Sequence, residues 1–281
     1  MELTDSISKQ LNPFRQYLID EERTPATIEK YIRDIQAFLQ QLSDEIVVSR
    51  EVVINYKKSL LEKYKSSSAN SMLVALNRYF DFCGRADLQV KLFKVQRTSF
   101  REQNKELSIE EYKRLVRVAK AKKNERLSLL IQTLCSTGIR VSEHQYITVE
   151  ALAVGRARIT NKGKERIIFL SKDLQKQLKK YCSEKGITSG PVFITKSGRP
   201  MNRCNIWKEM KALCSEADVD SQKVFPHNLR HLFALTFYRL EKDIVRLADI
   251  LGHTNIETTR IYTFTTAAEC IRSLSRLNLL I

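Results

Sequence analysis

The strongest constraint on the fold is a helical repeat of apolar residues near the N-terminus. The stretch TPATIEKYIRDIQAFLQQL, residues 24–42, starts with Thr24 as an expected N-cap and Pro25 at the first helical position. Its apolar residues recur every three or four positions, which is the spacing of one helix face: Ile28, Tyr31, Ile32, Ile35, Phe38, Leu39 and Leu42. Residues 50–64 and 68–83 are also predicted to be helical. We therefore expect a helical bundle with little strand in the first hundred residues.

A polar segment separates this bundle from a second part of the chain. Residues 94–106, KVQRTSFREQNKE, show no apolar periodicity. After them, Ser108 and Glu111 have the spacing of a capping box that opens a new helix. A length of 281 residues suits two domains. We predict a first domain at 1–97, a linker at 98–106 and a second domain at 107–281.

The second domain has a mixed pattern. RARIT and ERIIFL read as two short strands, and NKGK, residues 161–164, supplies the turn between them. Helices are predicted at 172–185, 203–217, 228–240 and 243–251. The fold class that follows is mainly α with a small β-sheet.

Charge limits the partners of this chain. The formal net charge is +16. Residues 1–104 hold 16 basic and 14 acidic residues, so 32 basic and 18 acidic residues fall in 105–281. An excess of this kind favours nucleic acid or an anionic membrane surface as partner. No apolar run is long enough to span a bilayer, and MELTDSISKQ lacks the features of a secretory signal, so we expect a soluble, cytoplasmic protein.

The six cysteines and four histidines show no metal-ligand spacing, so we predict no metal site and no cofactor. Three of the histidines nevertheless fall within 27 residues: His227, His231 and His253. In LADILGHTNIETTRIYT, an apolar helix face ends at Leu251, and Gly252 reads as the residue that stops the helix. Thr254 and Glu257 are spaced as a second capping box, which would start a helix that carries Tyr262.

These residue types suit attack on a phosphodiester. Two arginines, Arg140 and Arg230, can grip phosphate oxygens, because a planar guanidinium matches phosphate geometry. A tyrosine can act as nucleophile, a histidine can move its proton, and a lysine can protonate the leaving oxygen. Each residue also has an ordinary interpretation: Arg140 and Glu143 as a surface ion pair, Lys162 as an exposed turn residue, Tyr262 as a half-buried side chain. Their combination favours the chemistry.

At this point the chain resembles the tyrosine recombinases, or phage-type integrases. TGIRVSE, NKGKERIIFL, HNLRHLFA and LGHTNIETTRIYT are similar, in order and spacing, to the conserved boxes of that family. The resemblance covers about Leu107 to Tyr262 and extends more weakly to TPATIEKYIRDIQAFLQQL, which is similar to the start of the family's core-binding domain. It implies a helical DNA-clamping domain followed by a mostly helical catalytic domain.

The resemblance also implies the roles of individual residues. Arg140 and Arg230 would hold the scissile phosphate, with Glu143 orienting the active-site arginine. His253 would hydrogen-bond the phosphate, and His227 would accept a proton or contact the phosphate. Tyr262 would form a 3′-phosphotyrosyl link, and Lys162 would be the general acid for the 5′-hydroxyl.

Two departures from the family pattern stand out. His144 occupies a position where leucine is usual, and the hairpin turn is one residue shorter than the common form, which makes Lys164 a rival for the role of Lys162.

The implied function is site-specific recombination of double-stranded DNA, without metal or ATP, by a homo-tetramer on two DNA sites. Ile271, Leu274 and Leu277 would form an apolar stripe on a C-terminal tail that docks into a neighbouring subunit. The short, two-domain layout resembles the Xer type, and the divergent linker and hairpin favour a mobile-element enzyme. Alternatives are a chromosome dimer resolution recombinase, a type IB topoisomerase and a catalytically silent DNA-binding protein.

Overall fold

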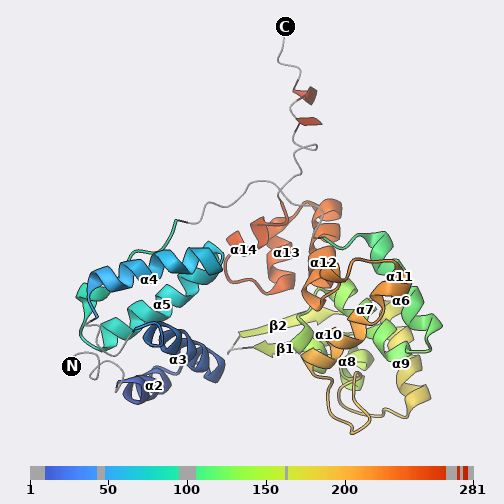
Figure 1. Ribbon diagram of the computed structural model, residues 1–281. Coiled ribbons are helices and arrows are strands. Elements are labelled where there is room, and N and C mark those ends of the chain that lie inside the picture. Colours follow the sequence, from blue (N-terminus) through green and yellow to red (C-terminus); the bar gives the residue numbers. More distant parts are fainter. Residues whose placement is uncertain are drawn as a thin grey trace. The chain divides into compact units, whose positions relative to one another are not determined.

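The computed structural model describes residues 10–42, 48–94, 106–161, 164–263, 271–272 and 275–277. The chain divides into two compact units, residues 1–97 and 98–281 (Figure 1). Helices predominate, and the described residues contain one two-stranded sheet, so the predicted mainly α class is confirmed. Within the described ranges, no helix combines the length and the apolar character needed to cross a bilayer.

The first unit is a helical bundle, as predicted. Its described elements are α2 (Leu11–Asp20), α3 (Pro25–Leu39), α4 (Arg50–Lys63), α5 (Ser66–Phe82) and the 3₁₀ turn η1 (Ala86–Leu88). The apolar face predicted on α3 enters the core, where Ile28, Ile32, Ile35 and Phe38 are buried. Pro25 takes the first helical position, but the hydroxyl of Thr24 bonds that of Thr27 at 2.9 Å and caps no backbone N–H.

The second unit is assembled around a buried helix, α7. Its described elements, in chain order, are α6 (Ile109–Ala121), α7 (Glu125–Thr137), η3 (Val141–Tyr146), α8 (Val149–Val154), β1 (Arg156–Asn161), β2 (Lys164–Phe169), α9 (Lys172–Lys185), α10 (Arg203–Lys211), α11 (Cys214–Ala217), η4 (Ser221–Lys223), α12 (Pro226–Glu241), α13 (Ile244–Leu251) and α14 (Glu257–Arg260). Helices α6, α9, α10 and α12 all pack on α7. The predicted capping box of Ser108 and Glu111 is present at the start of α6.

Two predicted elements differ in detail. The single helix expected at 203–217 is divided into α10 and α11. The strands β1 and β2 pair antiparallel, and the last pair is Asn161 with Lys164. Both residues were predicted to belong to a four-residue turn, so the strands are longer at this end than expected. Residues 162–163 lie outside the described residues.

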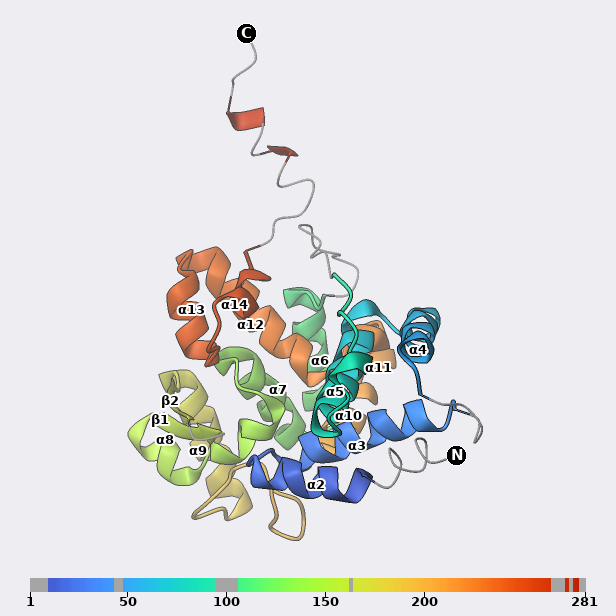
Figure 2. The ribbon, with the colours of Figure 1, turned by 90° about the vertical axis from the view of Figure 1, so that its left-hand side faces the viewer.

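The C-terminal helices form a small group of their own. Figures 1 and 2 both show α12, α13 and α14 together, and Leu235, Leu247, Leu251 and Tyr262 share a buried apolar cluster there. The capping box predicted for Thr254 and Glu257 was wrong, because the side chain of Asn255 accepts the backbone N–H of Glu257 at 2.8 Å.

Of the predicted tail stripe, Leu274 lies outside the described residues. Ile271 and Leu277 are exposed.

Candidate active site

Arg140 is positioned by a forced turn at the end of α7. Gly138 caps the helix with φ of +66°, and a Cβ there would lie 2.4 Å from the Cδ1 atom of Phe233, so only glycine fits. The chain then enters η3, where the carboxylate of Glu143 accepts two hydrogen bonds from Arg140. The backbone N–H of Arg140 donates at 2.7 Å and its side-chain Nη1 donates at 2.9 Å. Glu143 is 2% exposed. Arg140 is therefore held at both its backbone and its side chain.

Arg230 is buried one turn inside α12. Pro226 occupies the first turn of that helix and His227 follows it, so His227 and Arg230 lie one helical turn apart. The Nη1 atom of Arg230 donates to the carbonyl of Gly138 at 2.8 Å, and its Nη2 atom donates to the carbonyl of Leu251 at 2.7 Å. These bonds tie the ends of α7 and α13 to the second turn of α12.

His253 sits just past the end of α13, as the glycine stop predicted. Its Nε2 atom lies 3.0 Å from Nη2 of Arg230, and its Nδ1 atom lies 2.8 Å from Oγ1 of Thr259. A guanidinium can only donate, so Nε2 is the acceptor and the ring proton is on Nδ1, bonded to Thr259. Thr259 is fully buried, and the sequence alone did not single it out.

Tyr262 lies in the turn that follows α14 and not within the predicted helix. Its side chain is 3% exposed, and its ring meets the ring of His231 edge-on at a centroid distance of 4.9 Å. His231 in turn contacts the ring of His227 at 5.7 Å. In this structure the phenol is thus packed inside the C-terminal cluster, close to the histidines.

A third arginine completes the charge cluster. Arg166 of β2 donates to Glu143 at 2.5 Å and also bonds the carbonyls at the end of α13. Arg140 and Arg166 therefore bond the carboxylate of Glu143, and Arg230, which feels the charges of all three, leaves the cluster with a net positive charge. Such an arrangement attracts an anion. Sequence reasoning missed Arg166, although a basic residue inside an otherwise apolar strand was a usable signal.

Burial and the positive cluster together lower the pKa values of nearby arginine and histidine side chains. Burial, followed by the charges of Arg140 and Arg166, lowers the pKa of Arg230 to about 10. Burial and the nearby arginines, Arg230 foremost, lower the pKa of His253 to about 4. Loss of water around the ring, then the charges of Arg230 and Arg140, also lower the pKa of His227, although part of that residue is open to solvent. Both histidines are accordingly neutral at pH 7.

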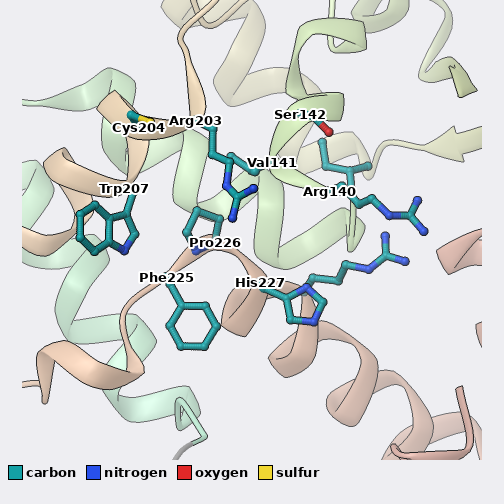
Figure 3. Close-up of a pocket in the computed structure, with 11 residues that line it drawn as sticks. Arg140, Val141, Ser142, Arg203, Cys204, Trp207, Phe225, Pro226 and His227 are labelled. Carbon is teal, nitrogen blue, oxygen red and sulfur yellow. The ribbon is translucent and has the colours of Figure 1, made fainter. Parts of the chain in front are cut away.

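An open cleft of about 760 Å³ borders these residues. In the view of Figure 3, Arg140 and His227 lie on one side of the cleft and Trp207 and Phe225 on the other. Arg203 extends from α10 between them. Arg203 and Trp207, which line the cleft from α10, were not among the predicted site residues, because neither belongs to a motif with a chemical role.

Two lysine candidates fall at the hairpin. Lys162 lies outside the described residues, and Lys164 begins β2. Among the described residues, no group of three or more His, Cys, Asp or Glu side chains could hold a metal ion. His144 is buried, with Nδ1 bonded to the carbonyl of Val141 at 2.5 Å, next to the ring of Phe193.

Comparison with known proteins places both units in one family. Residues 105–269 match the model of the phage integrase family, and residues 11–87 match that of the phage integrase N-terminal SAM-like domain. The chain is 30% identical to tyrosine recombinase XerA of Pyrococcus furiosus, across 97% of this chain and 95% of that protein.

Solved structures share the fold. A XerH site-specific recombinase bound to its difH substrate superposes with a TM-score of 0.71 at 19% identity, covering 95% of this chain and 84% of that one. A lambda integrase tetramer bound to a Holliday junction gives a TM-score of 0.73 at 16% identity, covering 91% of this chain and 76% of that one.

Proposed function

The chain belongs to the phage integrase family, the tyrosine recombinases, and on this premise we propose that it cuts and rejoins duplex DNA at specific sites with Tyr262 as nucleophile. The observation that carries the proposal is the cluster of Arg140, Arg166 and Arg230 around Glu143. A partly buried excess of guanidinium charge beside an open cleft suits a backbone phosphate.

The phosphate is held by Arg140 and Arg230. Arg140 gives Nη1 to Glu143 and its side chain remains 39% exposed, so further N–H donors are available on the cleft side. Arg230 lines the same cleft while its bonds to Gly138 and Leu251 keep it in place. His253 adds a donor to the phosphate once Arg230 donates to the phosphate in place of Nε2 and the ring proton moves to Nε2, because Thr259 can then donate to Nδ1.

The nucleophile has to move before it reacts. Tyr262 is 3% exposed, so a phosphate in the cleft is reached only after the turn that follows α14 shifts. This coupling keeps the phenol covered until DNA is bound. His227 is neutral at pH 7 and lines the cleft, which supports its role as acceptor of the phenol proton.

The proposed steps conserve bonds and protons. In cleavage, the Oη atom of Tyr262 bonds to phosphorus, and the bond from phosphorus to the 5′ oxygen breaks. The phenol proton passes to His227, and Lys162 protonates the departing 5′ oxygen, with Lys164 as the alternative acid. In joining, a 5′-hydroxyl of a partner strand attacks the phosphotyrosine and the protons return. The side chains supply the charge and the protons, so the route uses neither ATP nor a metal.

Covalent trapping tests this function. A duplex from the DNA that flanks the gene, nicked close to the cleavage point so that the free end diffuses away, is incubated with the protein and denatured. We expect a detergent-resistant protein–DNA adduct that forms in the presence of a metal chelator and disappears in Tyr262→Phe. Tight DNA binding without any adduct would instead support the catalytically silent alternative.

We further propose that the working assembly is a homo-tetramer on two DNA sites in the cytoplasm. The lambda integrase neighbour is a tetramer on a Holliday junction, which supports this stoichiometry by analogy. Deleting residues 267–281 should abolish pairing of two sites but leave single-site binding, as a gel-shift assay can measure. Unchanged recombination by the truncated protein would remove the tail from this role.

The biological setting that we propose is a mobile element, with chromosome dimer resolution as the alternative. Mapping the trapped adduct separates them. Cleavage at both ends of a movable segment supports the first, and cleavage at one chromosomal locus supports the second. Relaxation of supercoiled DNA of any sequence would point to a type IB topoisomerase.

A further inference from the structure

Arg166 is an unusual residue for its position in the hairpin. It pairs with Ile159 across the sheet, near the strand residues Ile159 and Ile168 that enter the core. Its side chain is only 12% exposed, and burial lowers its pKa. A charge is seldom held in such a place without a specific arrangement of partners.

The partners of Arg166 belong to two other segments of the active site. Nη2 donates to Oε2 of Glu143 at 2.5 Å, and Nη1 donates to the carbonyl of Ile250 at 3.3 Å and to that of Leu251. The side chain also fills the space beside Gly252, where a Cβ would lie 2.6 Å from Nη1. Gly252 thus has two roles. It adopts the left-handed conformation that ends the helix, with φ of +65°, and its lack of a side chain leaves room for Arg166.

Both anchors have other partners that would hold them without Arg166. Glu143 is also bonded twice by Arg140, and the carbonyl of Leu251 also accepts from Arg230. Strand β2 lacks such a substitute, because among the described residues its polar link to Glu143 and Leu251 is made by Arg166. On the neighbouring strand, the hydroxyl of Tyr146 donates to the carbonyl of Thr160 at 2.9 Å. Loss of Arg166 would therefore loosen β2 more than the phosphate site, while the bond from Tyr146 would still hold β1.

We propose that Arg166 is a positioning residue that fixes the β1–β2 hairpin, and with it the general acid, against the phosphate-binding arginines. This rests on the proposed function, in which a hairpin lysine protonates the leaving 5′ oxygen. Lys164 is two residues from Arg166 along β2, about 7 Å at the rise of a β-strand, and Lys162 is four residues away in the sequence. The proposal holds for either lysine.

The test separates proton donation from the rest of catalysis. Single-turnover cleavage is measured on two nicked duplexes, one with the natural phosphodiester and one with sulfur in place of the bridging 5′ oxygen. A thiolate leaves without a proton, so the second substrate does not need the acid. Lys162→Ala and Lys164→Ala identify the acid. Arg158→Met is the matched control, because Arg158 lies on β1 of the same hairpin but is 72% exposed.

We expect Arg166→Met to slow cleavage of the natural substrate by about 100-fold, the scale of one general acid. On the sulfur substrate its rate should return close to wild type, as for the lysine variant that removes the acid, while Arg158→Met is fast on both. Equal slowing on both substrates would overturn the proposal, because Arg166 would then serve the phosphate or the fold. Undiminished cleavage of the natural substrate would also overturn it.

Two further measurements keep the test decisive. Melting temperature and DNA affinity are recorded for each variant, and if Arg166→Met does not fold, Arg166→Lys takes its place. That variant keeps a charge near Glu143 but loses the fork that reaches two segments, so the same rescue by sulfur is expected. If the wild-type protein cleaves neither substrate, the proposed function fails and not the role of Arg166.

Discussion

At the scale of single residues, the site is defined by a charge that its own side chains do not balance. Arg140 and Arg166 bond the carboxylate of Glu143 and Arg230 adds a third positive charge nearby, while burial, together with these arginines, keeps His253 neutral. A bound phosphate would supply the missing negative charge. The positive charge that favours a bound anion therefore adds to the effect of burial in lowering the pKa of His253.

The pKa of His253 should report on this charge. It is about 4 in the free protein, below the ordinary value of about 6.5 that the unfolded chain keeps. Between these values the unfolded chain binds a proton that the folded protein does not, so stability should fall as pH is lowered from about 6.5 to about 4. NMR titration of the imidazole gives the pKa directly, and a phosphate mimic should raise it. A midpoint near 6.5 in the free protein would contradict this effect of burial and charge.

His253→Gln supplies the control for the stability measurement. It should weaken the fall in melting temperature over the same pH range. His227, whose pKa is also lowered, leaves a residual slope.

Thr259 should matter for rate because its hydroxyl can accept from His253 or donate to it. Thr259→Val keeps the shape of this fully buried side chain but removes both options, so we expect cleavage to slow by about tenfold or more, the loss of one buried hydrogen bond. Thr259→Ser retains the hydroxyl and should stay within a few-fold of wild type. Equal rates for the valine and serine variants would show that this contact does not affect cleavage.

The sequence pointed to candidate residues by their chemical type but not to the residues that hold them in place. Arg140, Arg230, His253 and Tyr262 were chosen because their types suit phosphate chemistry. The burial of Tyr262 was not predictable, because its cover comes from residues distant in the chain, such as Leu235. Arg166 and Thr259 belong to local patterns that are common in any strand or helix, and only their tertiary partners make them significant.

At the scale of elements, glycine decides how helices end beside the site. Gly138 and Gly186 both cap helices with φ near +65°, but only Gly138 is crowded, by Phe233. Gly186→Ala should cost about 1 kcal/mol, from backbone strain alone. Gly138→Ala adds overpacking and should cost roughly 2–4 kcal/mol. Denaturant unfolding compares the two, and equal losses would mean that the ring of Phe233 moves away freely.

Some helices could be predicted from the sequence and some helix boundaries could not. The amphipathic face of α3 was readable because one side of that helix meets the core and the other meets water. The break between α10 and α11 was not, because Met210, Leu213, Cys214 and Ala217 continue the buried pattern across it without a glycine or proline. Packing and not local sequence sets that boundary.

At the scale of the whole molecule, positive charge is concentrated in residues 105–281, the part that contains the cleft beside Arg140 and His227. If this surface contacts DNA phosphates, as we propose, each contact should release counterions from the DNA. Binding of Tyr262→Phe to its site should weaken by roughly 10³-fold or more between 50 and 200 mM salt, as six or more phosphate contacts give. Fluorescence anisotropy measures this, and a change of less than about tenfold would show that few phosphates are contacted.

The central claim is that Tyr262 becomes covalently joined to a 3′ phosphate. The most direct measurement is mass spectrometry of the peptide–nucleotide adduct after nicked DNA is cleaved and the complex is digested. We predict one modified peptide, with the nucleotide on Tyr262 and a free 5′-hydroxyl on the released strand. A nucleotide on another residue, or a tyrosine joined to a 5′ phosphate, would contradict it.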